Sequence, residues 1–136
     1  MIKPKLVKPV KKTLKQKPLA DHIVDLAWGK RLRDDAKGIC EYCGITHFPN
    51  AHHIFSRRNW SVRWELDNGI CLCSKHHTFS PEFSAHLTPM EFAEWIKEKR
   101  GEEWYEKLRA LKMQNIKKSS IDKRKVLAEL RMRYET

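Results

Sequence analysis

The sequence lacks any hydrophobic run near the roughly 20 apolar residues that a membrane-spanning helix needs. Its lysine-rich N-terminus also lacks the apolar core of a secretory signal. We therefore expect a soluble, intracellular protein with no membrane partner. The phosphate-binding pattern GxxxxGKS or GxxxxGKT is missing, and no internal repeat appears, which argues against a P-loop NTPase and a repeat protein.

Acidic residues are scarce relative to basic ones. The 136 residues include 17 Asp and Glu against 28 Lys and Arg, which gives a formal net charge of +11. Clustered Lys and Arg release condensed counterions from phosphates, so nucleic acid is the partner that this charge fits best. The alternative is a solvated cationic surface without a polyanionic partner.

The chain divides into four parts of what we expect to be a single domain. Residues 1–18 hold seven lysines and three prolines without an acidic residue, which predicts a flexible basic arm. We expect an N-terminal helix in 19–37, a metal-binding core in 38–87 and C-terminal helices in 88–136. Together these parts predict the α+β class.

Helix signals are most complete after the core. Thr88 and Glu91 are spaced as in a capping box, Pro89 suits a first turn, and Gly101 can end the helix. In the N-terminal helix, Asp21 is expected in the first turn and Gly38 at the stop. The apolar residues at helical spacing are Ile23, Leu26 and Ala27; then Phe92, Trp95 and Ile96; then Trp104, Leu108 and Leu111; and last Leu127, Leu130 and Tyr134.

The cysteines suggest a metal site, because a reducing compartment disfavours disulfides. Cys40 and Cys43 are separated by two residues, and Cys73 and His76 have the same spacing. These four residues predict a closed, tetrahedral site for structural Zn²⁺. If "NGICLC" forms a strand, Cys71 and Cys73 share one face, so a four-cysteine site that leaves His76 free is the competing assignment.

Three histidines of the core remain outside this zinc site. His52 and His53 are adjacent, and adjacent residues of a strand point to opposite faces, so they need different roles. If His52 and His77 hold a divalent cation, His53 can take a proton from a water directed at a phosphorus atom. The alternative is that one histidine of this adjacent pair only makes polar contacts, and the pair by itself favours that interpretation.

The segments "CEYC", "AHHI", "DNGICLC" and the terminal "HH" together resemble the HNH nuclease family, which is built on a ββα-metal fold. The wider stretch "SRRNWSVRWELDNGICLCSKHHT" is similar to the small phage-encoded HNH endonucleases. The resemblance covers about residues 38–80. It implies a ββα-metal core with a structural zinc site, flanked here by helices and by the basic arm.

The resemblance also implies roles for individual residues. His53 matches the general base, and Asn68 matches the Asn that braces the loop and orients the base. His52 and His77 match ligands of the catalytic ion, for which Mg²⁺, Mn²⁺ and Ni²⁺ are candidates. Many relatives have a cysteine at the position of His76. Some add a third metal-binding His where this chain has Ser80 and Pro81; His86 is a candidate substitute, whereas His47 is expected to be incidental.

The implied reaction is hydrolysis of DNA phosphodiester bonds, by nicking or double-strand cutting. Arg57 and Arg58 follow the base and can grip phosphates, and Lys11 and Lys12 of the arm should contact double-stranded DNA without regard to its sequence. Phage relatives imply genome processing or packaging beside terminase proteins, in a bacterial cytoplasm.

Two alternatives stay open: a non-catalytic, zinc-stapled nucleic-acid-binding module, and an enzyme that acts on RNA. Further basic residues at the C-terminus are Lys117, Lys118, Lys123, Arg124, Lys125, Arg131 and Arg133.

Overall fold

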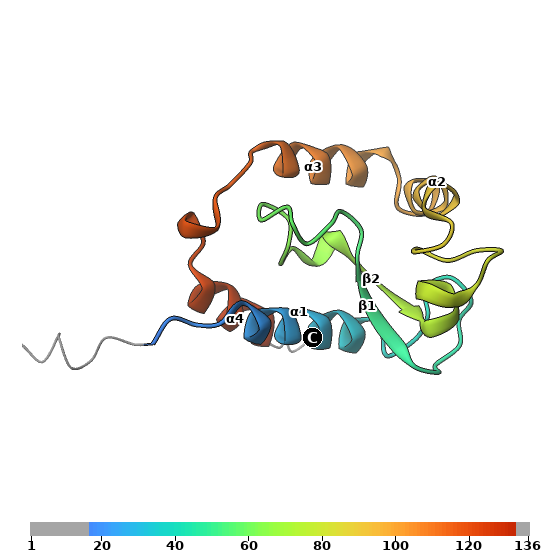
Figure 1. Ribbon diagram of the computed structural model, residues 1–136, viewed down its shortest axis with the longest axis horizontal. Helices are drawn as coiled ribbons and strands as arrows, with labels where there is room; N and C mark the ends of the chain where they lie inside the picture. Colours follow the sequence, from blue (N-terminus) through green and yellow to red (C-terminus); the bar gives the residue numbers. More distant parts are fainter. Residues whose placement is uncertain (1–16, 133–136) are drawn as a thin grey trace, which may run out of the picture.

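The computed structural model describes residues 17–132 and shows a mixed α+β fold with one small sheet (Figure 1). Lys11, Lys12 and nearly all of the expected basic arm, as well as Arg133 and Tyr134, lie outside the described residues. Within them, no helix has both the length and the apolar composition to cross a membrane. The elements are α1 (Asp21–Asp35), β1 (Pro49–His53), η2 (Leu66–Asn68), β2 (Gly69–Cys73), η3 (Lys75–Phe79), α2 (Pro89–Arg100), α3 (Glu102–Met113), η4 (Lys118–Ser120) and α4 (Lys123–Arg131).

Helix α1 forms where the sequence predicts a helix, but it buries a different face. Its buried stripe consists of Val24, Trp28 and Leu32, spaced four residues apart. Leu26 is 66% exposed, so the expected stripe that contained it is wrong. Two apolar sets share this helix, and the set that contains the large Trp28 side chain removes more apolar surface from water.

The two strands form an antiparallel pair in which His53 lies opposite Gly69 and Pro49 lies opposite Cys73. Helix α1 packs closely on one face of this sheet. A Cβ atom at Gly69 would lie 2.7 Å from side-chain atoms of both Leu32 and Trp28, so only glycine permits this approach. The lack of a side chain at Gly69, opposite His53, therefore allows α1 to lie this close to the sheet.

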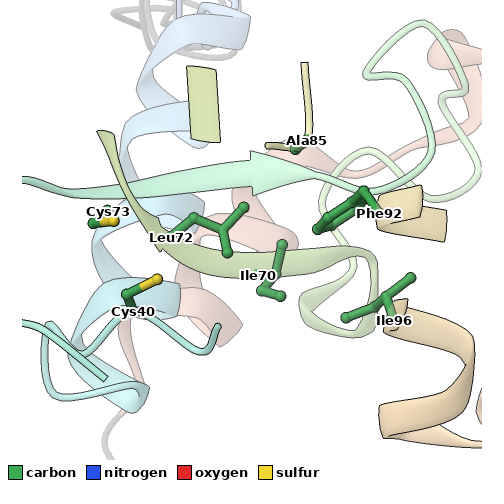
Figure 2. Packing of buried hydrophobic residues seen from close by; sticks show 7 residues of the cluster. All are labelled: Cys40, Ile70, Leu72, Cys73, Ala85, Phe92 and Ile96. Atoms are coloured by element: carbon green, nitrogen blue, oxygen red, sulfur yellow. The ribbon is translucent and has the colours of Figure 1, made fainter. Parts of the chain in front are cut away.

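The other face of the sheet carries the second part of the core. Ile70 and Leu72 of β2 pack with Phe92 and Ile96 of α2, and all four side chains are buried (Figure 2). Alternation along the strand places Ile70 and Leu72 on the same face. This arrangement holds α2 beside the strand that carries His52.

Helix α2 begins at Pro89 and ends at Gly101 as expected, with Gly101 at φ +92°. The expected capping box is absent, because the Thr88 side chain does not bond the helix N-terminus. Instead the Thr88 hydroxyl accepts from the N–H of Ser84 and donates to its C=O, both at 2.9 Å. The Thr88 hydroxyl therefore stabilises the turn at Ser84 instead of capping α2.

Helices α3 and α4 follow where helices are expected, and α4 lies alongside α1 (Figure 1). Leu130 of α4 is buried in the same cluster as Val24 and Trp28. Asp21, in the first turn of α1, pairs with Lys118 at 2.6 Å and with Lys123 at 3.0 Å. The loop between β1 and β2 lies between α1 and α3, so both helices border the chain that follows His53 (Figure 1).

Candidate functional site

Cys40, Cys43, Cys73 and His76 form the first group of potential metal ligands, with all ligand atoms within 4.8 Å of one another. Two come from the turn after α1, one from the end of β2 and one from η3. The Sγ atoms of Cys43 and Cys73 are 3.8 Å apart. Tetrahedral Zn²⁺ with Zn–S bonds of about 2.3 Å requires a sulfur spacing of about 3.8 Å, so this geometry suits zinc.

The same group excludes Cys71 from the cluster. The four ligand atoms lie within 4.8 Å of one another, and the Cys71 thiol is not among them. Cys71 is opposite Ala51, whose side chain packs on the α1 side of the sheet. Of the two assignments made from sequence, the structure groups the mixed set with His76.

A second group brings together His52, His77 and His86, with ligand nitrogens also within 4.8 Å of one another. The Nε2 atoms of His77 and His86 are 3.1 Å apart. Ligand nitrogens about 2.1 Å from a metal ion lie about 3.0 Å apart in cis octahedral positions, so this spacing matches a shared ion. Three protein ligands leave coordination positions open, unlike the closed cysteine group.

Backbone hydrogen bonds place His86 beside His77. The N–H of His86 donates to the C=O of His77 at 3.1 Å, and the N–H of Ala85 donates to the C=O of His76 at 2.9 Å. Between His77 and His86, the Ser80 hydroxyl accepts hydrogen bonds from the backbone of Glu82 and Phe83. The chain therefore loops back and supplies the third histidine later in the sequence.

The electrostatics of this group favour metal binding. Burial is the main cause that lowers the pKa of His52 to about 3, and it also lowers the pKa of His77. Both imidazoles are thus neutral at neutral pH, which is the form that binds a cation. The residues present fit a divalent ion that accepts nitrogen ligands, such as Zn²⁺, Ni²⁺ or Mn²⁺.

His53 points away from this group, as alternation along β1 predicts. Its Nε2 atom lies 2.9 Å from the C=O of Arg63, and its ring stacks on Trp28 with centroids 3.9 Å apart. A carbonyl can only accept, so Nε2 carries the proton and Nδ1 keeps its lone pair. Burial lowers the pKa of His53, so the ring is neutral and able to accept a proton at Nδ1.

Asn68 is fully buried and binds the backbone just beyond His53. Its Oδ1 accepts from the N–H of Phe55 at 2.7 Å, and its Nδ2 donates to the C=O of Phe55 at 3.0 Å. The C=O of Asn68 also accepts from the N–H of Ile54 at 2.8 Å. These bonds fix the course of the chain where it leaves β1.

His53 and the three grouped histidines line one cleft of about 810 Å³. His52 and His53 point to opposite sides of β1, yet both line the cleft, because β1 ends at His53. A histidine group that can hold a divalent ion and the neutral His53 ring share this cleft, and such an arrangement can activate water for hydrolysis. Other side chains at the cleft include Arg57, Phe55, Phe92, Trp104 and Tyr105.

Arg57 and Arg58 are exposed and face different hollows. Arg57 lines the histidine cleft, whereas Arg58 lines a second hollow of about 390 Å³. Among the described residues at this second hollow there are four cations and no carboxylate; Lys118 is also paired with Asp21. We call it the cationic hollow; its lining consists of Arg58, Asn59, Trp60, Ser61, Lys112, Asn115, Ile116, Lys117 and Lys118.

Sequence reasoning missed two residues near His53. Arg63, whose C=O meets the His53 ring, forms an ion pair with Asp25 of α1. Their separation of 38 residues leaves no local signal in the sequence. Comparisons with models of protein families, with curated proteins and with solved structures found no match, so this site stands on its own geometry.

Proposed function

We propose that the protein is a metal-dependent endonuclease of the HNH type that hydrolyses phosphodiester bonds of DNA. The observation that carries this proposal is the shared cleft, in which a neutral His53 with a free Nδ1 lies near a three-histidine group. A non-catalytic binding module has no need for these four imidazoles or for the buried Asn68.

The order of elements supports a ββα-metal core. Strands β1 and β2 and the turn of helix η3 follow one another, and they carry His52, His53 and His77 at the positions that the HNH resemblance assigns. Helix η3 is a five-residue π-helix. His86, from the loop before α2, supplements His52 and His77 as the third ligand of the proposed site.

In the proposed reaction, Nδ1 of His53 takes a proton from water, the water oxygen forms a bond to phosphorus, and the bond from phosphorus to the leaving oxygen breaks. The Nε2–H bond to Arg63 and the contacts of Asn68 with Phe55 keep the ring in place. Arg57, exposed at the cleft, is placed to contact a phosphate oxygen. A divalent cation bound by the three histidines supplies charge stabilisation at the phosphate and at the leaving oxygen.

We assign the group of Cys40, Cys43, Cys73 and His76 to structural Zn²⁺. Cys40 and Cys73 are buried in the same cluster as Ile70 and Leu72, so the ion would join the turn after α1 to the sheet. A closed site of this kind contributes directly to folding free energy in a small core. Its role is to hold η3, and with it His77, against β2.

The test is cleavage of supercoiled plasmid by zinc-loaded protein with Mg²⁺, Mn²⁺ or Ni²⁺, beside the same reaction with EDTA. We expect nicked or linear product that requires metal and that disappears in His53→Ala. His47→Ala is the matched control, because His47 is exposed and lies outside both metal groups. Tight DNA binding without cleavage by the folded wild type would instead favour the binding module, and selective cleavage of RNA would replace DNA as the substrate.

A further inference from the structure

The carbonyl group that holds His53 belongs to a residue whose side chain is anchored on α1. Arg63 Nε and Nη2 donate to the two carboxylate oxygens of Asp25 at 3.0 and 2.7 Å. Both side chains are largely buried, with exposed fractions of 12% for Arg63 and 24% for Asp25. A two-bond pair of this kind fixes the orientation of both groups, unlike a single contact between flexible surface charges.

Neighbouring contacts restrict the same segment further. The Nε1 atom of Trp64 donates to Asp25 at 2.8 Å, and Nε1 of Trp28 donates to the C=O of Glu65 at 3.0 Å. Trp28 is also the residue on which the His53 ring stacks. Helix α1 therefore contacts the face of the imidazole and, through Asp25, the residue whose carbonyl meets its edge.

We propose that Asp25 and Arg63 are positioning residues for the proposed hydrolysis: they hold the Arg63 carbonyl where it binds Nε2–H of His53 and leaves Nδ1 free. This inference rests on the proposed role of His53 as the base. Asp25 lies outside the segment that resembles the HNH family, so neither the family pattern nor the comparisons assign it a role. In this protein the N-terminal helix α1 therefore helps to orient His53.

The reason for such an anchor lies in the two forms of neutral imidazole. If the Arg63 carbonyl moves away, Nε2 loses its acceptor, and the proton can reside on Nδ1 instead. A ring with a proton on Nδ1 cannot accept one there from water. A shift of about 1 Å in the position of a reacting group can also reduce the rate on the order of 100-fold.

The experiment compares Arg63→Gln and Asp25→Asn with the wild type in two measurements. The first is ¹⁵N NMR of the His53 ring in zinc-loaded protein with Mg²⁺ at one pH, with the His53→Gln spectrum used for assignment. The second is kcat and KM for plasmid cleavage. Asp35→Asn is the matched control, because Asp35 is also paired with an arginine on α1, at 2.9 Å, and lies far along the helix from Asp25.

We expect the wild type and Asp35→Asn to show a single tautomer with the proton on Nε2. In the two test variants we expect a mixture of tautomers and a loss of kcat on the order of 100-fold, with KM changed by less than about twofold. A variant that only weakened folding would restore wild-type kcat when assayed at lower temperature, whereas the tautomer mixture would persist in the folded protein.

Two results would overturn the inference: an unchanged His53 tautomer in folded Arg63→Gln, or an equal loss of kcat in Asp35→Asn. If Arg63→Gln does not fold, Arg63→Lys retains one charged donor and gives the same two readouts. Failure of the proposed function looks different, because then either the folded wild type does not cleave or His53→Ala cleaves as well as the wild type, while the NMR measurement still reports whether Asp25 and Arg63 orient the ring.

Discussion

The Nε2 atoms of His77 and His86 lie 3.1 Å apart, although nine positions of the chain separate them. This distance suits two ligands of one ion, and His52 lies beside both, with ring centroids 5.0 Å from His77 and 5.2 Å from His86. His86 is therefore the third member of the proposed catalytic metal site.

The first prediction concerns His86. We expect His86→Ala to weaken binding of Mn²⁺ by at least roughly tenfold, since loss of a ligand should exceed the effect of losing a supporting residue. Isothermal titration of zinc-loaded protein measures this change, and His47→Ala serves as the control with equal loss of an imidazole. An unchanged Mn²⁺ affinity in His86→Ala would remove His86 from the site.

The second prediction separates the two cysteines of β2. We expect Cys73→Ala to lose bound zinc and to unfold at a lower temperature, because it removes one of four ligands. Cys71→Ala should keep its full zinc content, since Cys71 lies outside the ligand group. Elemental analysis and thermal unfolding of both variants check this, and zinc loss from Cys71→Ala as well as from Cys73→Ala would favour the four-cysteine assignment.

The third prediction concerns Asn68. In Asn68→Ala both backbone groups of Phe55 lose their partner, and an unsatisfied buried group costs about 1–3 kcal/mol. We expect the free energy of unfolding to fall by about 2–5 kcal/mol, as measured by denaturant titration of zinc-loaded protein. Asn59→Ala removes a single exposed hydrogen bond to Ser56 and should cost less than about 1.5 kcal/mol. Equal losses in the two variants would contradict the bracing role.

The fourth prediction assigns the cationic hollow to phosphate contacts beside the cleft. Lys112 lies over the ring of Phe55, which lines the histidine cleft, so a strand that leaves the cleft would meet Lys112 and then Arg58 and Lys117. In the His53→Ala background, we expect Lys112→Gln and Lys117→Gln each to reduce the slope of log K against log salt by about 0.9 for duplex DNA.

The control for this measurement is Lys107→Gln, which removes the same charge from an exposed position of α3 outside the hollow. Its salt slope should match that of the parent protein in fluorescence anisotropy titrations. Parallel titrations with duplex DNA and with RNA show which polyanion the hollow prefers. If the Lys107 change lowers the slope as much as the other two, the effect is one of net charge and the hollow has no special role.

The zinc group shows what local sequence can specify. Cys40 and Cys43 lie on one turn, and Cys73 and His76 span the exit of a strand, so each pair is close in space because it is close in the chain. Spacing favoured His76, but alternation along the strand left Cys71 as a competing ligand. The folded structure decided the choice, because it groups the His76 ring nitrogen, and not the Cys71 thiol, with the other three ligand atoms.

Helix positions were also predictable, whereas their faces and caps were not. The sequence of α1 contains two apolar sets, and contact with the sheet selected Val24, Trp28 and Leu32. Thr88 has the pattern of a cap, but the turn at Ser84 uses its hydroxyl. In both cases the competing partner lies outside the helix, so no pattern within the helix reveals it.

The sequence by itself determined the pairs of ligands, the alternation that separates His52 from His53, and the excess of positive charge. Only the tertiary structure brought His86 to His77 and tied Arg63, beside His53, to Asp25 of α1. The physical reason is how far apart in the sequence the contacting residues lie. Spacing and alternation are properties of neighbouring residues, whereas these contacts depend on how α1 and the loop before α2 pack on the sheet.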